Sequence, residues 1–318
     1  MSPYRRALPL KERLFVADGG LETWLVFHEG VDLPAFAAFD QLKDDEGLAR
    51  LRRWYERYVA MARTHGCGLL LEAPTWRANP DWGAAIGYDA EALAAVNRRA
   101  VEMLEELRER HAAPSLPIVV SGVVGPRGDG YVVEKRMSPE EARDYHAAQI
   151  GVFADTAADL VSAYTLNYAE EAMGIALAAR QHGIPAALSF TVETDGRLPS
   201  GEPLGEAIER TDAATGDYAA YYMVNCAHPE HFAPALAAGA PWLGRIGGLR
   251  ANASRLSHAE LERCTELDTG DPLDLGAHYR GLRRSLPALS VLGGCCGTDH
   301  RHVGAICAAV MPATEAVA

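Results

Sequence analysis

Three of the six cysteines stand where their sulfurs could bind a metal together. Cys226 follows the apolar run 222–224. Cys295 and Cys296 follow the apolar run 289–292. If both runs are parallel strands of one barrel, their carboxyl ends open on the same mouth and the three sulfurs meet there. Thiolates are preferred ligands of Zn²⁺, and three of them leave a fourth position in which a substrate thiol would become a nucleophilic thiolate.

The same cysteines also fit an interpretation without metal. Cys226 lies far along the chain from the adjacent pair, so the spacing is unlike a local Cys-x-x-Cys zinc knuckle, and three buried thiols would give the same pattern. Cys67 precedes an expected strand. Cys264 and Cys307 lie in helix-like sequence, where a free cysteine is usually a small buried hydrophobe. A long chain without an export signal is also not expected to carry a disulfide framework.

The elements that must position these residues alternate between short apolar runs and longer amphipathic segments, a pattern typical of repeated βα units. We expect eight strands, at residues 14–17, 68–72, 117–121, 160–164, 186–190, 220–224, 242–246 and 289–293. Helix-like segments cover 47–64, 90–111, 139–157, 169–182 and 229–238. Because no strand is followed by a Gly-x-Gly-x-x-Gly turn, the pattern favours an α/β fold of the (β/α)₈ TIM barrel type over an open, doubly wound sheet.

No repeat, low-complexity stretch or linker divides the chain, so residues 1–318 are expected to form a single barrel domain. The least regular part, 247–287, is expected to form a rim elaboration of the barrel. Ser138 followed by Pro139 and two acids predicts a helix start, because serine caps the first turn and acids favour its dipole.

Composition excludes disordered, collagen-like and coiled-coil proteins. The 318 residues are 48% hydrophobic and 23% charged, as in ordinary globular proteins. Lys and Arg number 30 against 43 Asp and Glu, a net charge of −13, which disfavours nucleic acid and anionic membranes as partners. No stretch approaches the roughly 20 apolar residues of a membrane span. We expect a cytoplasmic protein that acts on small molecules, and the sequence does not predict its oligomeric state.

Three motifs, in this order, resemble the homocysteine S-methyltransferase family. They are Asp18-Gly19-Gly20, Asn225-Cys226 and Gly293-Gly294-Cys295-Cys296-Gly297-Thr298. The resemblance implies a (β/α)₈ barrel, one Zn²⁺ held by the three motif cysteines, and methyl transfer from an onium or pterin donor to a zinc-bound small thiol such as homocysteine. It also implies that Asp18 holds the ammonium group of the amino acid, with Gly19 and Gly20 letting the backbone come close to it.

The sequence departs from the family after the fourth expected strand. The family usually has a Glu-Thr pair there, whose carboxylate helps to hold the homocysteine amine, but this chain has Tyr164 and Thr165. A phenol, with a pKa of about 10, is uncharged at neutral pH, so a charged contact is lost or becomes a neutral hydrogen bond. We therefore expect homocysteine to be a poor acceptor unless Glu22 or Glu193 compensates. Either acid could instead belong to a helix start or a turn.

The glycine-rich loop at 121–130 lacks the Lys-Ser/Thr ending of a phosphate-binding loop, which disfavours a nucleotide. The family has a similar segment lining its site, so the resemblance makes Gly122 and Gly125 positions of close approach. Arg127 would either meet a substrate carboxylate or lie on the surface. His228 is expected to support the structure rather than bind metal.

Four aromatic residues near strand ends would either hold an onium donor over a ring face or pack in the core. These are Trp24, Trp76, Tyr164 and Tyr168.

Two alternatives to a zinc-dependent S-methyltransferase remain open. One is a metal-binding or regulatory barrel without turnover, suggested by the change at Tyr164. The other is a demethylase of methylated sulfur or nitrogen compounds. Formation of a methylated thiol would distinguish an S-methyltransferase from a barrel without turnover.

Overall fold

The computed structural model describes residues 2–236 and 239–311, and eight parallel strands in it close into a barrel. The strands are β1 (Phe15–Val16), β2 (Gly68–Glu72), β3 (Ile118–Val124), β4 (Leu160–Leu166), β5 (Ala186–Phe190), β6 (Ala219–Asn225), β7 (Ile246–Ala251) and β8 (Val291–Gly294). Each pairs with its neighbours in sequence, and the barrel closes where Phe15 pairs with Val291 and Val16 with Leu292. The expected (β/α)₈ barrel is confirmed.

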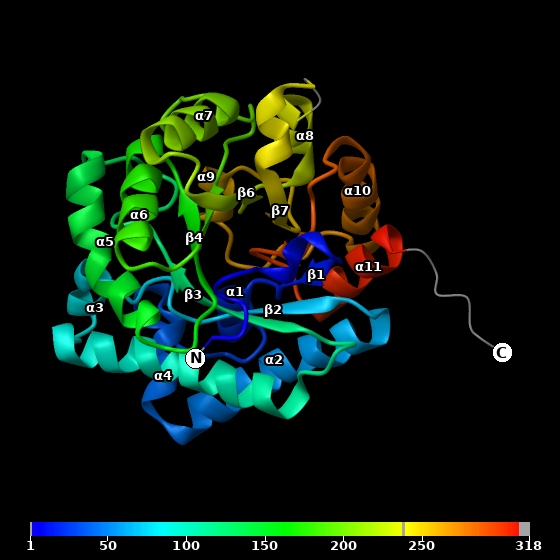
Figure 1. Ribbon diagram of the computed structural model, residues 1–318. Coiled ribbons are helices and arrows are strands. Elements are labelled where there is room, and N and C mark those ends of the chain that lie inside the picture. The colour runs from blue at the N-terminus through cyan, green and yellow to red at the C-terminus, as the bar shows by residue number, and fades with distance from the viewer. Residues whose placement is uncertain (1, 237–238, 312–318) are drawn as a thin grey trace.

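Helices surround the barrel (Figure 1). They are α1 (Leu21–Phe27), α2 (Asp45–His65), α3 (Pro80–Ala85), α4 (Ala90–His111), α5 (Pro139–Ala154), α6 (Ala169–Gln181), α7 (Leu204–Thr215), α8 (Pro229–Leu236), α9 (His258–Leu261), α10 (Pro272–Ser285) and α11 (His300–Val310). The helix start at Ser138 is confirmed, because its hydroxyl accepts a hydrogen bond from the backbone N–H of Glu141 (3.2 Å). Among the described helices, none has the length and apolar character needed to cross a membrane.

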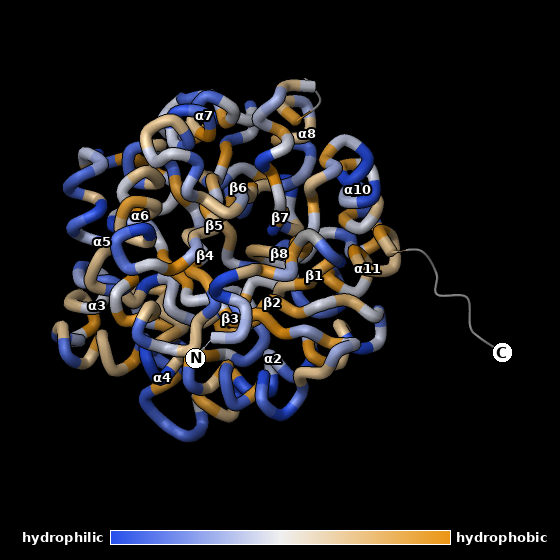
Figure 2. Tube along the Cα trace, in the orientation of Figure 1, coloured by the Kyte–Doolittle hydropathy of each residue, from blue (hydrophilic) through white to orange (hydrophobic). Residues whose placement is uncertain are grey.

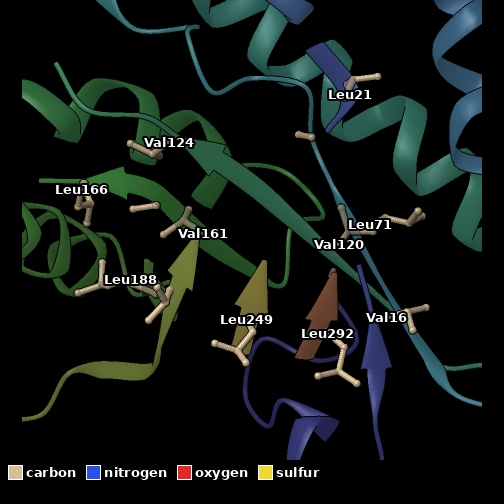
Figure 3. Packing of buried hydrophobic residues seen from close by; sticks show 14 of the residues in the cluster. Val16, Leu21, Leu71, Val120, Val124, Val161, Leu166, Leu188, Leu249 and Leu292 are labelled. Atoms are coloured by element: carbon tan, nitrogen blue, oxygen red, sulfur yellow. The ribbon is translucent and has the colours of Figure 1, made fainter. Parts of the chain in front are cut away.

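Apolar side chains fill the barrel and also separate it from the helices. Successive strand residues point to opposite faces, so Phe15 and Val119 pack in the interior while Val16 and Val120 pack toward the helices. Figure 3 shows the second group on several strands, and Figure 2 shows hydrophobic residues concentrated on the central strands. The packed interior leaves the ends of the strands as the place for a site.

The expected seventh strand at 242–246 is wrong. Pro241–Arg245 forms a 3₁₀ helix, and β7 begins at Ile246. Gly247 and Gly248 make this strand hard to recognise in the sequence, because glycine is uncommon within strands. In the structure, a Cβ on Gly247 would lie 2.8 Å from Tyr221, and a Cβ on Gly248 would lie 2.6 Å from Met223. The side chains of the neighbouring strand β6 therefore leave no space for a larger residue at these two positions. As a result Arg250, expected in the rim segment, lies within a barrel strand instead.

Candidate active site

A cavity of about 260 Å³ lies at the carboxyl ends of the strands. Nine of the candidate site residues from the sequence line it: Asp18, Gly19, Gly20, Glu22, Tyr164, Asn225, Cys226, Cys295 and Cys296. Two candidates do not. Gly122 faces outward, where a Cβ would overlap the Phe153 ring, and Glu193 lies beside His258, 3.3 Å from its Nδ1. Neither of these two residues lines the cavity.

The three motif cysteines meet at this cavity, with their sulfurs within 4.8 Å of one another. Cys226 Sγ lies 3.9 Å from Cys296 Sγ. Cys226 and Cys295 are joined by a disulfide, with their Cα atoms 5.4 Å apart. The sequence favoured thiols or metal ligands over a disulfide framework; one pair is bonded here, while the three sulfurs together form a group that could hold a metal ion. The disulfide forms because the loops after β6 and β8 bring the two residues side by side, and it must be reduced before all three sulfurs can bind a metal.

The remaining cysteines lie elsewhere. Cys307 is buried, as expected, and Cys67 is buried as well, whereas Cys264 is exposed beyond the end of α9. The expectation that Cys264 is a buried helical residue is wrong because α9 is only four residues long and ends at Leu261. Burial raises the pKa of Cys296 to about 11, so its free thiol is protonated at neutral pH.

Asn225, the last residue of β6, joins the end of that strand to β4 and β5. Its Oδ1 accepts hydrogen bonds from the backbone N–H of Thr165 (3.0 Å) and from Ser189 Oγ (2.7 Å), and its Nδ2 donates to Thr165 Oγ1 (2.9 Å). Thr165 and Cys226 have positive φ angles of 62° and 54°, which are uncommon for residues other than glycine. Asn225, a candidate substrate contact from the sequence, lines the cavity, and its amide also holds this strained backbone in place.

We expect Asn225→Ala to lower the free energy of unfolding by about 2–3 kcal/mol, because three hydrogen bonds near ~1 kcal/mol each are lost. Ser189→Ala removes only one of the three and should cost about 1 kcal/mol. Urea denaturation of the reduced variants measures both values. Equal losses in the two variants would contradict this role for Asn225.

Arg250 is the centre of a buried charged cluster. Its Nε donates to the Gly294 carbonyl (2.9 Å), its Nη2 donates to Asp18 Oδ1 (2.5 Å) and the Gly19 carbonyl (3.0 Å), and its Nη1 pairs with the Glu72 carboxylate. Burial disfavours the charged guanidinium, but the two carboxylates outweigh this and hold the pKa of Arg250 well above its ordinary value. This one side chain joins the ends of β1, β2, β7 and β8.

Tyr164 occupies the position of the family's expected carboxylate, and its hydroxyl donates to Glu72 Oε1 (2.6 Å). Its ring lies 5.1 Å from the Arg250 guanidinium carbon. Burial beside Glu72 raises the pKa of Tyr164 well above its ordinary value, so the phenol is uncharged. A carboxylate is thus present near this position, but it comes from Glu72 on β2 and is already paired with Arg250.

The two acids near the first motif have different partners. Asp18 accepts hydrogen bonds on both oxygens, from Trp54 Nε1 (2.8 Å) and from Arg250. Glu22 lines the cavity at the start of α1, and burial raises its pKa to about 7. The motif glycines have a structural reason as well, since a Cβ on Gly20 would lie 2.5 Å from the Cys295 carbonyl oxygen.

The loop between β3 and α5 supplies a cavity residue that the sequence reasoning missed. Tyr131 donates its hydroxyl hydrogen bond to Cys226 Sγ (3.4 Å), and its ring lies 4.3 Å from that of His258. The glycine-rich character of this loop drew attention to Gly125 and Arg127 instead. Gly125 packs against Trp76, and Arg127 is an exposed residue paired with Asp81 (2.8 Å), which confirms its surface interpretation.

Two of the four candidate aromatic residues, Trp76 and Tyr164, line the cavity. Trp24 packs against Trp54 with 4.9 Å between ring centroids and 37° between the ring planes. Tyr168 accepts a hydrogen bond from the Met137 backbone N–H (3.2 Å). These last two residues therefore pack rather than form part of the cavity wall.

His228 does not join the cysteine cluster. It lies instead beside Asp274 and His278, and the ligand atoms of these three residues are close enough to one another to hold a metal ion. Burial, together with the positive potential of His278, lowers the pKa of His228 to about 4, so its ring is neutral at neutral pH. Its Nδ1 accepts a hydrogen bond from the Glu230 backbone N–H (3.3 Å).

Comparisons with known proteins agree with this arrangement. A family model described as homocysteine S-methyltransferase matches residues 15–310. Homocysteine S-methyltransferase 4 from Zea mays is 26% identical over 318 residues, covering 94% of this chain and 90% of that protein. Crystal structures of the homocysteine methyltransferase MmuM from Escherichia coli have the same fold. The oxidized form has a TM-score of 0.73 at 21% identity and covers 97% of this chain and 99% of that one. The metallated form has a TM-score of 0.72 at 22% identity and covers 95% and 98%.

Proposed function

Because this chain belongs to the homocysteine S-methyltransferase family, we propose that it transfers a methyl group from an onium or pterin donor to a small thiol. The observation that carries the proposal is the meeting of three cysteine sulfurs at a cavity walled by Trp76, Tyr131 and Tyr164. In the reaction the donor–methyl bond breaks, a sulfur–methyl bond forms, and the thiol proton leaves. The protein's share is to align the two substrates and exclude water.

Cys226, Cys295 and Cys296 would hold one Zn²⁺ once the disulfide is reduced. Tetrahedral zinc with Zn–S bonds of about 2.3 Å separates its sulfur ligands by about 3.8 Å. The separation of 3.9 Å between Cys226 and Cys296 fits that geometry. When bound, the metal would supply the positive charge that lets a coordinated substrate thiol react as a thiolate. The metallated form of the E. coli relative also supports a metal here.

The surrounding residues would orient the reactants. Tyr131 directs its hydroxyl at Cys226 Sγ and so fixes one sulfur. Trp76 and Tyr164 line the cavity and would lie beside a bound donor, although each ring already has an arginine guanidinium near it, Arg77 at Trp76 and Arg250 at Tyr164. Asp18, as the acid of the first motif, would hold a substrate ammonium group, although it shares its charge with Arg250.

Product analysis tests the proposal. Reduced, zinc-loaded protein is incubated with a panel of thiols against S-methylmethionine, S-adenosylmethionine, betaine and methylated folate, and methylated thiols are measured by mass spectrometry. A methylated thiol formed by the unaltered protein, but not by Cys296→Ala, supports a methyltransferase. Stoichiometric zinc with no product from any pair would instead favour a barrel without turnover. A demethylase of methylated sulfur or nitrogen compounds would form the same methylated thiol, but its rate would depend on the identity of the donor and little on that of the thiol.

The acceptor gives a further prediction. Homocysteine is expected to be a poor acceptor, because the neutral Tyr164 and the paired Glu72 leave its ammonium group short of one charged contact. Tyr164→Glu alone would place two carboxylates side by side, so we combine it with Glu72→Gln. The double variant should bind homocysteine roughly tenfold to a hundredfold more tightly, a gain of about 1.5–3 kcal/mol.

The matched probe is 4-mercaptobutanoate, which lacks the amine and should gain nothing from the double change. Steady-state kinetics with both thiols measure the difference. Efficient methylation of homocysteine by the unaltered protein, lost in the double variant, would show that the phenol belongs to a working homocysteine site.

A further inference from the structure

Arg77 is a buried cation whose hydrogen bonds are not satisfied within the described part of the protein. It lies in the loop between β2 and α3, is 9% exposed and lines the cavity. Neither its Nε nor its Nη1 has a hydrogen-bond partner. A guanidinium that leaves water without gaining an acceptor destabilises the fold. The stability of the fold therefore does not explain why an arginine is buried here, and binding of a ligand would explain it.

Two indole rings hold this guanidinium. Its central carbon lies 3.5 Å from the ring centroid of Trp82 and 4.4 Å from that of Trp76. Trp76 Nε1 donates to the Tyr164 carbonyl (3.3 Å) and Trp82 Nε1 donates to the Gly128 carbonyl (3.3 Å), so both rings are anchored. Cation–π contacts use the face of a guanidinium and leave its N–H groups free to donate. The group is therefore preorganised for an acceptor that comes from the cavity.

The acidic groups around Arg77 do not neutralise it directly. Burial lowers the pKa of Arg77; Asp129 and Glu22 oppose this shift through space, but neither forms a salt bridge with it. The Asp129 carboxylate accepts hydrogen bonds from the backbone N–H groups of Tyr131 (2.7 Å) and Val132 (2.9 Å) instead. This contrasts with Arg250, each of whose three guanidinium nitrogens has a protein acceptor. Of the two arginines in the cavity wall, Arg77 is the one with free donors.

We propose that Arg77 binds a carboxylate of one of the two substrates, either the acceptor thiol or the methyl donor. A carboxylate matches the planar guanidinium with two parallel hydrogen bonds, and its charge would be neutralised in a site that excludes water. The proposal deepens the proposed function and rests on it for the identity of the two substrates. It makes Arg77 a specificity-determining residue that selects acidic substrates for this cavity.

Equilibrium binding to the reduced, zinc-loaded protein tests this with two pairs of probes. The acceptor pair is homocysteine and 3-aminopropane-1-thiol, which lacks only the carboxylate. The donor pair is S-methylmethionine and its decarboxylated analogue, (3-aminopropyl)dimethylsulfonium. In one of the pairs, Arg77→Gln should raise the Kd of the carboxylate-bearing member at least tenfold and leave that of its partner within twofold. The pair that responds identifies which substrate carries the carboxylate.

Arg127→Gln is the matched control, since it makes the same change at an exposed arginine outside the cavity and should leave all four Kd values unchanged. Arg77→Gln should also unfold at the same or a higher temperature than the unaltered protein without ligand, because a buried unpaired cation is removed. The inference is overturned if the unaltered protein favours neither carboxylate-bearing probe, or if Arg77→Gln weakens both members of each pair equally. Methyl transfer in the product assay, with Kd values unaffected by Arg77→Gln, would leave the proposed function standing and reject this inference alone.

Discussion

Cys296→Ala is expected to reduce the zinc content of the reduced protein from about one ion per chain to near zero and to abolish methyl transfer. A zinc site with three protein ligands loses most of its affinity when one thiolate is removed, and the remaining cysteines can only pair with each other. Cys296 is the informative choice, because it lies outside the disulfide between Cys226 and Cys295. Metal analysis after reduction and dialysis against a weak chelator measures the loss.

The control for this experiment is Cys264→Ala, which removes an exposed thiol that is not part of the cluster and should leave zinc content and activity unchanged. Cys307→Ala should also retain zinc, although it opens a small gap in the core beside Cys67. Full zinc occupancy in a Cys226→Ala, Cys295→Ala double variant would contradict the assignment of the metal ligands.

Arg250→Met should lower the free energy of unfolding by about 3–5 kcal/mol, the usual cost of breaking a buried ion pair by removing one partner. Methionine retains much of the volume, so the loss reports mainly on the Asp18 and Glu72 carboxylates left without their cation. Urea denaturation measures it. Replacing Glu72 with Gln in the same chain should recover part of the stability, because one of the stranded charges is then absent.

The pH dependence of Arg250→Met gives an independent check. Burial raises the pKa of Glu72, and Arg250 is the main group that opposes this rise. Without Arg250 the folded protein holds a proton on Glu72 more tightly than the unfolded chain does, so the variant should gain stability relative to the unaltered protein as pH falls from 8 to 5. Arg255→Met, at an exposed arginine with two surface partners, should show a much smaller loss and no such trend. A loss in Arg250→Met that is independent of pH would contradict the charge argument.

Local patterns in the sequence predicted the parts of the molecule that depend on neighbouring residues. Serine before proline and two acids marked the start of α5, and apolar runs followed by turn residues marked most strands. The cysteine cluster was also predictable, because the rule that strand ends share one mouth needs no knowledge of distances. The disulfide within it was not, since pairing depends on which two of three neighbouring sulfurs approach most closely.

The charged part of the site could not be predicted in the same way. Arg250 was missed because two glycines made β7 resemble a loop, and its partners come from strands far away in the sequence. Glu72 is the last residue of an expected strand, so its place in the cavity wall could have been predicted, because residues at the carboxyl ends of barrel strands line the mouth. Its bond to Tyr164 depends on residues 92 positions apart in the chain. The isolation of Arg77 is a missing contact, and a sequence shows no contacts.

The bonds among Glu72, Tyr164 and Arg250 also constrain how this protein can diverge from its relatives. An arginine at 250 is tolerated because two carboxylates receive it, and a glutamate at 164 would crowd the acid that already lies there. Loss of Arg250 alone, or gain of a glutamate at position 164 alone, would therefore leave an unpaired charge in the barrel mouth. Within the family the three positions should be inherited as a set, so that descendants with tyrosine at 164 keep arginine at 250 and an acid at 72.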